Sequence, residues 1–308
     1  MDNAQSREAN MHLIQLLATF EVLDPVARVT TYYLLFDWAQ GNLKDFWRVN
    51  QNLVGDRTHS LWMSQQLHEI CLALQCVHNE RQTTLQSTDT TKLAKGPTGR
   101  SFTINELYGR HGDIKPDNFL WFHPAQPSSD LLVLCDFGLG RLHTQVSRSN
   151  QDPRNLARTA TYIAPEFDLA DGMISRASDI FSLGCVFLEY VTWYLRGPDS
   201  VLNQFPSRRN DIDIYNFEAD KFFVILPDGN NGQRPILKPQ VKSWIAELQQ
   251  HGNCSWYLYQ LLEIIRDRML EPEREKRINI VQLIKEMQKL RQACERNDSF
   301  YLKTIEEE

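Results

Sequence analysis

Hydrophobic residues follow two different spacings along the chain, and each spacing predicts a type of element. Short apolar runs at residues 13–20 and 31–36 lie on either side of a turn-prone Asp-Pro pair. A second pair of runs, at residues 118–122 and 131–135, flanks a loop rich in proline and serine. Short apolar runs that surround such turn signals predict two β-hairpins.

The other apolar positions have a helical period. Four stripes, at residues 67–77, 180–191, 258–269 and 280–290, repeat every three or four residues. This is the pattern of helices that bury one face. A shorter helix is expected after residue 41. Because the helical stripes are longer and more numerous than the hairpins, we predict an α+β fold that is mainly α, with small β-hairpins.

Three polar segments interrupt this pattern. Residues 80–110 are rich in threonine, glutamine, serine and lysine, and loops longer than about 15 residues are usually functional or disordered. We expect a disordered insertion there. Residues 197–240, with several prolines and an Asn-Gly pair, predict a long irregular connection. Residues 295–308 predict an acidic C-terminal tail.

Charge and composition narrow the classes of function. The chain has 308 residues, of which 33 are basic and 39 acidic, for a formal charge of −6. A nucleic-acid partner needs a basic face and is therefore not expected. There is no run of about 18 apolar residues and no apolar signal segment near the start, so no membrane association is expected. Six scattered cysteines without a Cys-x-x-Cys pair indicate an intracellular protein of the cytoplasm or nucleus.

Acidic and amide side chains mark the ends of the second predicted hairpin. Asn118 precedes its first strand and Asp136 follows its second. Antiparallel strands would place these two residues at adjacent ends, where their oxygens can bind a hard cation such as Mg²⁺ that also binds phosphates. Asp113 would lie near the same cation, and Lys115 adds a positive charge. Such a group fits phosphoryl transfer, in which positioning and charge neutralisation supply most of the catalysis.

Five motifs in the same order resemble the C-terminal lobe of a eukaryotic protein kinase, over about residues 12–290. LLFDWAQGNL at 34–43 resembles the hinge that receives adenine. HGDIKPDN at 111–118 resembles the catalytic loop, and DFG at 136–138 the magnesium motif. APE at 164–166 resembles the end of the activation segment, and SDIFSLG at 178–184 the start of the central buried helix.

This resemblance assigns catalytic roles to residues of this chain. Asp113 would accept the proton of the substrate hydroxyl, and Lys115 would neutralise the transferred phosphate. Asn118 and Asp136 would hold magnesium. Thr159 would bond Asp113 and Lys115, and the combination of Lys115 and Thr159 implies serine or threonine as the acceptor.

The resemblance also assigns binding and structural roles. Phe36 would be the gatekeeper residue, and the backbone near Asp37 and Ala39 would meet the adenine of ATP. Asp179 would brace the catalytic loop from beneath. Arg277 occupies the position of the arginine that pairs with the APE glutamate, which is Glu166 here.

The front of the chain departs from the family pattern. The kinase N-terminal lobe, a five-stranded sheet plus a helix, needs roughly 60 residues or more, so residues 1–36 are expected to be only a remnant of it, a strand hairpin before a C-terminal lobe at 37–294. No GxGxxG occurs, and the first lysine is Lys44, so the phosphate-clamping loop and lysine have no equivalents. The hairpin would keep an apolar face and an unpaired edge, which is an aggregation liability.

The catalytic loop carries the second departure, because Gly112 stands where many kinases have an arginine. That arginine receives a phosphate on the activation segment, so phosphorylation of Thr144, Ser147 or Ser149 is expected to change activity little. HGDxxxxN also occurs in small-molecule phosphotransferases, which lack the APE segment. We expect an ATP- and magnesium-dependent serine/threonine kinase acting on a protein substrate. A catalytically inactive pseudokinase or interaction module is the main alternative, and a small-molecule phosphotransferase is a weaker one.

Overall fold

A computed structural model describes part of the chain in detail. The described residues are 11–24, 28–79, 109–123, 130–136, 161–169, 172–212, 218–229 and 232–305. Almost all of the expected insertion at 80–110 therefore lies outside the described residues. Thr159 also lies outside them, as do Thr144, Ser147 and Ser149, whose phosphorylation is expected to change activity little. None of the helices in the described ranges has both the length and the apolar character that a membrane crossing requires.

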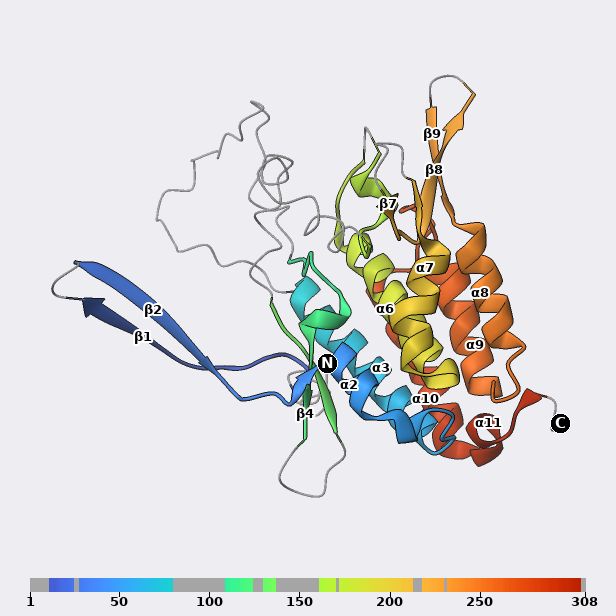
Figure 1. The fold of residues 1–308 in the computed structure, drawn as a ribbon, viewed down its shortest axis with the longest axis horizontal. Helices are drawn as coiled ribbons and strands as arrows, with labels where there is room; N and C mark the ends of the chain where they lie inside the picture. Colours follow the sequence, from blue (N-terminus) through green and yellow to red (C-terminus); the bar gives the residue numbers. More distant parts are fainter. Residues whose placement is uncertain are drawn as a thin grey trace.

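Long helices form the body of the molecule (Figure 1). They are α3 (His59–Asn79), α6 (Arg176–Arg196), α8 (Pro239–Gln249), α9 (Trp256–Ile264) and α10 (Ile280–Arg296). The four predicted apolar stripes fall on α3, α6, α9 with the turn that follows it, and α10, so those predictions are confirmed. α6 is the central helix, because nearly all of its residues from the first turn onward are buried.

Capping residues set the ends of α6. The Ser175 hydroxyl accepts a hydrogen bond from the backbone N–H of Ala177, and the Ser178 hydroxyl accepts one from the backbone N–H of Ser175. This reciprocal arrangement satisfies amides that would otherwise have no partner at the helix start. At the other end Gly197 has φ +81°, a left-handed conformation that costs little only for glycine.

Shorter helices connect the long ones. They are α2 (Leu43–Val49), η1 (Gln51–Leu53), η3 (Pro116–Asn118), η5 (Pro165–Phe167), η6 (Ser200–Gln204), α7 (Phe205–Arg209), η7 (Ile265–Met269) and α11 (Asp298–Leu302). The residues predicted as an acidic tail thus include the end of α10 and the whole of α11, and Tyr301 of α11 is buried.

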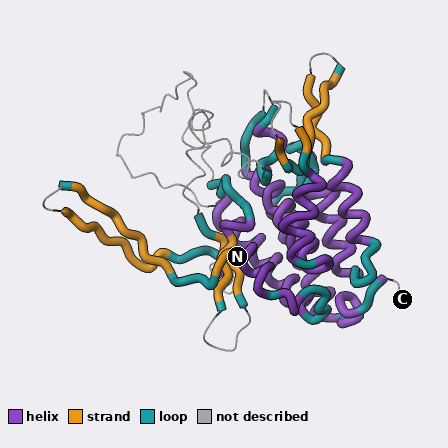
Figure 2. Tube along the Cα trace, viewed as in Figure 1, coloured by secondary structure: helices purple, strands orange, loops and turns teal. Residues whose placement is uncertain are grey.

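The strands form small antiparallel sheets at the edges of the helical body (Figure 2). The pairs are β1 (Leu16–Asp24) with β2 (Val29–Phe36), β3 (Gly41–Asn42) with β4 (Phe119–Phe122), β4 with β5 (Leu131–Leu134), β6 (Asp211–Ile212) with β7 (Glu218–Ala219), and β8 (Phe223–Asp228) with β9 (Gly232–Leu237). Both predicted hairpins are present. The expectation of a long irregular connection at 197–240 was wrong, because this stretch holds α7, β6 to β9 and the start of α8.

An aromatic cluster fills the core between α2, α3, α6 and β4. The ring of Phe46 lies 5.3–5.8 Å, centroid to centroid, from Trp62, Trp121 and Trp193, and it is completely buried. Trp193 also donates its indole N–H to the backbone carbonyl of Trp47. These contacts join the helices to the sheet of β3, β4 and β5, whose strand β4 directly follows the loop at 111–118.

The β1–β2 hairpin projects from this body (Figure 1). Just before it, the chain is anchored by the buried His12, whose ring bonds Leu132 O and Glu69, and by backbone bonds to Leu134. Every residue of β1, and every residue of β2 except the partly buried Thr30, is exposed. Whether it is the remnant of a larger lobe stays a prediction.

Candidate functional site

The start of α6 holds the loop at 111–118 in place. The carboxylate of Asp179 accepts hydrogen bonds from the backbone N–H groups of His111 and Gly112, both at 2.9 Å, and also contacts His78 Nε2 at 2.9 Å. Gly112 has φ +83°, which an L side chain would strain. Asp179 therefore braces the loop as predicted. The contribution of His78, at the end of α3, was missed because its position alone indicates only a core residue.

Two of the predicted catalytic residues, Asp113 and Lys115, converge with the predicted metal ligand Asn118. Lys115 Nζ donates to Asp113 Oδ2 at 2.7 Å. Asn118 Nδ2 donates to the backbone carbonyl of Asp113 at 2.7 Å and lies 3.2 Å from its Oδ2. Asp113 and Asn118 are buried, whereas Lys115 is partly exposed. The carboxylate of Asp113 therefore lies beside the ammonium group of Lys115. The hydrogen bond from Asn118 to the Asp113 carbonyl holds the turn at residues 113–118 in this conformation.

Asp136 lies at the same end of the β4–β5 pair. Phe119 pairs with Leu134 in that ladder, and the Cys135 N–H donates to Asn118 O at 2.9 Å, so the backbone brings Asp136 next to Asn118. Asp136 is exposed and has φ +65°. A non-glycine residue in this region is strained, which is common at functional sites.

These residues fit a magnesium ion. Asn118 uses its amide nitrogen for both of its bonds to Asp113, which leaves the Oδ1 oxygen as a possible ligand. The exposed Asp136 carboxylate supplies a second hard oxygen donor. Within the described ranges no three His, Cys, Asp or Glu residues cluster as a complete metal site. Magnesium that binds one or two protein oxygens takes the rest of its shell from phosphates and water.

His111 serves the fold of the loop. Its Nε2 lies 2.9 Å from the carbonyl of Cys135, and burial lowers its pKa while the nearby Asp179 acts in the opposite direction. A buried, neutral imidazole suits a hydrogen-bonding role.

The predicted adenine-side residues lie elsewhere: Phe36 is the last residue of β2, and Asp37 and Ala39 lie between β2 and β3. Phe36 and Asp37 are exposed and Ala39 is partly buried. The adjacent Gln40 N–H donates to Trp121 O, which ties this stretch to the sheet of β3, β4 and β5. No hydrogen bond or ion pair between described residues links these side chains to Asp113, so their role in binding ATP stays a prediction.

The predicted pair of Glu166 and Arg277 is confirmed. The two guanidinium nitrogens of Arg277 donate to the two carboxylate oxygens of Glu166 at 2.9 and 3.0 Å. Ser178 adds a hydroxyl donor at 2.7 Å. Both charged side chains are buried, and bidentate pairing of this kind is the strong form of an ion pair.

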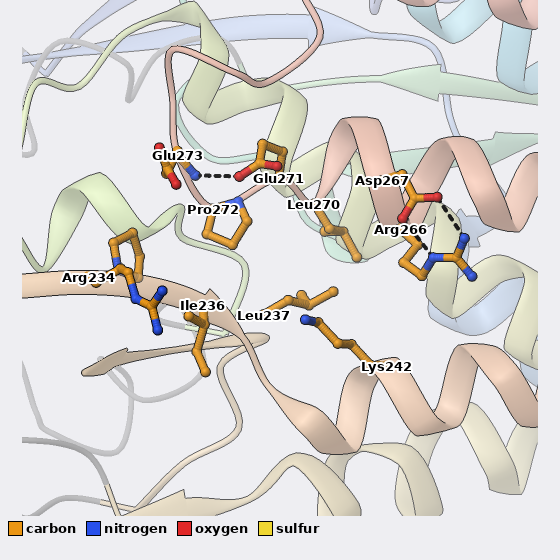
Figure 3. Close-up of a pocket in the computed structure, with 11 residues that line it drawn as sticks. Arg234, Ile236, Leu237, Lys242, Arg266, Asp267, Leu270, Glu271, Pro272 and Glu273 are labelled. Carbon is orange, nitrogen blue, oxygen red and sulfur yellow. Dashed lines mark hydrogen bonds and ion pairs between the residues drawn. The ribbon is translucent and has the colours of Figure 1, made fainter.

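A separate pocket of about 430 Å³ lies between β9, α8 and the stretch after η7 (Figure 3). Its floor contains the buried Leu237 and Leu270, and Lys242 reaches toward it from α8 (Figure 3). It contains none of the residues at 111–136. The chemistry predicted from the sequence therefore does not lie in this pocket.

Comparisons with known proteins agree with the motifs. The family model described as "Protein kinase domain" matches residues 108–288. "Cyclin-dependent kinase E-1" of Arabidopsis thaliana is 23% identical over 264 residues, which are 82% of this chain and 48% of that protein. "Casein kinase I homolog 3" of Schizosaccharomyces pombe is 31% identical over 109 residues, 34% of this chain and 24% of the relative. "Serine/threonine-protein kinase ppk23" of the same yeast is 28% identical over 155 residues, which are 50% of this chain and 37% of that protein. The chain thus spans about half or less of the length of these relatives.

Proposed function

Because the chain belongs to the protein kinase domain family, we propose that it is an ATP- and magnesium-dependent protein serine/threonine kinase. One observation carries this proposal: Asp113, Lys115 and Asn118 meet within hydrogen-bond distance on a loop braced by the central helix. The names of relatives that match at the sequence level, among them a cyclin-dependent kinase and a casein kinase I homolog, support it.

In the proposed mechanism Asp113 orients the acceptor hydroxyl and takes its proton. The ammonium group of Lys115 lies 2.7 Å from Asp113 Oδ2. In the proposed mechanism this group contacts the oxygens of the transferred phosphoryl group and neutralises their charge. Asn118 and Asp136 would hold magnesium, which when bound neutralises the nucleotide phosphates. The hydrogen bonds from Asn118 to Asp113 keep the base and the metal ligand in a fixed relation.

The acceptor and the compartment are part of the same proposal. Lys115, together with Thr159 outside the described residues, supports serine or threonine as the acceptor residue. All six cysteines are free thiols, which supports a reducing compartment such as the cytoplasm or nucleus. The substrate is proposed to be a protein because APE, the central helix and the Glu166–Arg277 pair are present together.

An inactive nucleotide-binding or interaction module is the second candidate. It is favoured by the placement of Lys44. Lys44 lies at the start of α2 and its Nζ donates to Asp117 at 2.7 Å, so it is not positioned as the lysine that pairs with the α and β phosphates.

Phosphoryl transfer by the full chain separates the two candidates. The assay follows labelled phosphate from MgATP to casein, with Asp113→Asn as the test variant and Asp117→Asn as the matched control. Asp117 lies on the same loop but is exposed and pairs with Lys44. Loss of the general base should lower the rate by at least about 100-fold, whereas the control should change it little. Equal transfer by wild type and Asp113→Asn would exclude the kinase mechanism, and magnesium-dependent ATP binding without transfer would favour the inactive module.

A further inference from the structure

The pocket between β9, α8 and the stretch after η7 has the features of a binding site. Its volume of about 430 Å³ lies within the range of ligand-binding pockets. The buried Leu237 and Leu270 form its floor. Pro235, Ile236 and Pro272 are partly exposed and add apolar surface that a ligand can reach. Charged side chains surround this surface (Figure 3). An apolar centre within a charged rim is the usual anatomy of a site that binds a protein segment.

Both walls of the pocket are held from inside the fold. Lys238, at the junction of β9 and α8, is 5% exposed, and its Nζ donates to Arg209 O at 2.7 Å. On the other side, the buried Arg277 donates from Nε to Glu271 O at 2.8 Å and from Nη2 to Pro272 O at 3.2 Å. The pocket is therefore preformed, and a ligand that enters it does not have to order its walls.

The acidic side chains of the rim already have partners. Asp267 accepts two hydrogen bonds from Arg266, at 2.7 and 2.6 Å (Figure 3). Glu273 pairs with Lys276 at 2.7 Å. Glu271 Oε1 accepts the backbone N–H of Glu273 at 2.9 Å. The negative charges of the rim are thus balanced or hydrogen-bonded within the walls of the pocket.

Two basic side chains of the rim differ from these acids. Lys242 of α8 and Arg234 of β9 are exposed, and neither side chain has an ion pair or a hydrogen bond to another described residue. Figure 3 shows the amino group of Lys242 directed toward Leu237 on the pocket floor. The uncompensated charge of the pocket is therefore positive, and a negatively charged ligand complements it.

β9 favours insertion of a side chain over addition of a strand. β8 and β9 form a two-stranded sheet, so the other edge of β9 has no partner strand among the described residues. Pro235 lies in the middle of β9, opposite Ile225, and proline has no N–H to donate. An extended peptide therefore cannot form a continuous ladder along this edge. An apolar side chain that enters the pocket does not need such a ladder.

We infer that this pocket binds an acidic segment of a partner protein. The segment inserts one bulky apolar side chain against Ile236 and Pro272, and its carboxylates lie beside Lys242 and Arg234. The residues that line the pocket have no role in the proposed kinase mechanism. The site therefore goes beyond the proposed function and is tested separately from it.

The test uses a synthetic peptide as the ligand of the full chain. A fluorescein-labelled hexapeptide carries leucine and phenylalanine at its centre and two aspartates at each end, and fluorescence anisotropy follows its binding. One control peptide replaces the aspartates with lysines, and another replaces the central pair with glycines. We expect saturable binding of the acidic peptide with a Kd below about 1 mM, and at least about tenfold weaker binding of both controls. No saturable binding of the acidic peptide, or equal binding of either control, would overturn the inference.

Variants of the chain show whether the rim carries this binding. Lys242→Glu and Arg234→Glu reverse the two uncompensated charges at exposed positions, where folding should be little affected. Lys285→Glu is the matched control, because Lys285 is exposed on α10 and does not line the pocket. We expect each rim variant to raise the Kd about fivefold or more, since like charges oppose binding, and the control to change it less than about twofold. Equal Kd values in the rim variants and the control would contradict the assigned site.

Sedimentation velocity tests a second copy of the chain as the occupant. Wild type and Lys242→Glu should sediment alike. A dimer that dissociates in Lys242→Glu would assign the pocket to a second copy and would rule out the acidic partner.

Hydrogen exchange locates the bound peptide. At saturation, amides at 232–242 and 266–273 should exchange at least about twofold more slowly than in the free chain, while those at 16–36 and 111–118 should not change. Protection confined to 16–36 would mean that the peptide binds the exposed hairpin instead of the pocket. None of these measurements depends on phosphoryl transfer, so an inactive chain would remove the proposed kinase function and leave this test intact.

Discussion

The helical body and the β1–β2 hairpin use similar residues in opposite ways. α6 buries nearly every residue from Ser178 to Leu195, whereas every residue of β1 is exposed. The hairpin nevertheless contains leucine, valine, phenylalanine and tyrosine on both of its faces. Apolar residues stabilise a fold only when they leave water. The comparison shows that an apolar sequence alone does not make a core, because a second surface must cover it.

The same difference separates the predicted site residues that the helical body holds in place from those at the end of the exposed hairpin. Asp113 and Asn118 lie on a loop that α6 holds through Asp179. Phe36 is the last residue of the exposed β2, and Asp37 directly follows it. We therefore expect stability to depend on the body, and the hairpin to contribute mainly to association with other surfaces.

The sharpest test replaces one aromatic residue in each region with alanine. Phe46 is 0% exposed and packs against three tryptophans, so Phe46→Ala should lower the free energy of unfolding by about 3–5 kcal/mol. Phe20 is 51% exposed and stacks on Tyr33 with ring centroids 5.0 Å apart, so Phe20→Ala should cost less than about 1 kcal/mol. Urea denaturation measures both. Equal losses would mean that the hairpin is part of the cooperative core.

Part of this contrast could be predicted from the sequence. The apolar period placed α3, α6, α9 and α10, and short runs around turns placed both hairpins, because these signals are local. The same reasoning called 197–240 irregular, since prolines mask short strands and helices. The motifs led to Asp113, Lys115, Asn118 and the Glu166–Arg277 pair.

The buried ion network could not be predicted in this way. Arg209, Glu189 and Asp220 are charged residues that a local pattern assigns to the solvent. Their pairing joins α6, α7 and the stretch after β7, and only the folded chain brings these together. For the hairpin, one uncovered apolar face was expected, whereas every residue of β1 is exposed. The alternation of apolar residues describes the faces of a strand without saying what covers them.

A smaller effect is expected from the pH dependence of the body. His59 packs beside Phe46 and contacts the Tyr190 hydroxyl at 2.8 Å, and burial lowers its pKa from 6.5 to about 4. Between these values the unfolded chain binds a proton that the folded chain does not. The contribution of the neutral His59 to the free energy of unfolding is therefore fully present above pH 6.5. It is lost as the pH drops toward 4, which lowers the free energy of unfolding by up to about 3 kcal/mol.

Urea denaturation at pH 7 and pH 5 isolates this histidine when wild type is compared with His59→Phe. The variant keeps an aromatic ring and has no titratable group at this position. Wild type should lose about 2 kcal/mol more than His59→Phe between the two pH values. The hairpin at 16–36 contains no histidine, so it adds nothing to this difference. Parallel losses in the two proteins would show that His59 can be protonated within the folded body.

The smallest effect on stability, and the largest on association, is expected at the hairpin. Leu23 and Leu34 are 63% and 61% exposed. Replacing both with lysine should change the free energy of unfolding by less than about 1 kcal/mol, because neither is buried. Charged residues on an exposed strand pair oppose edge-to-edge pairing, so self-association measured by sedimentation velocity should fall. Val281→Lys, at a 50% exposed position on α10, is the matched control and should leave association unchanged. Equal decreases in the hairpin variant and the control would assign self-association to general surface charge, and a large loss of stability in the hairpin variant would mean that this region is covered in solution.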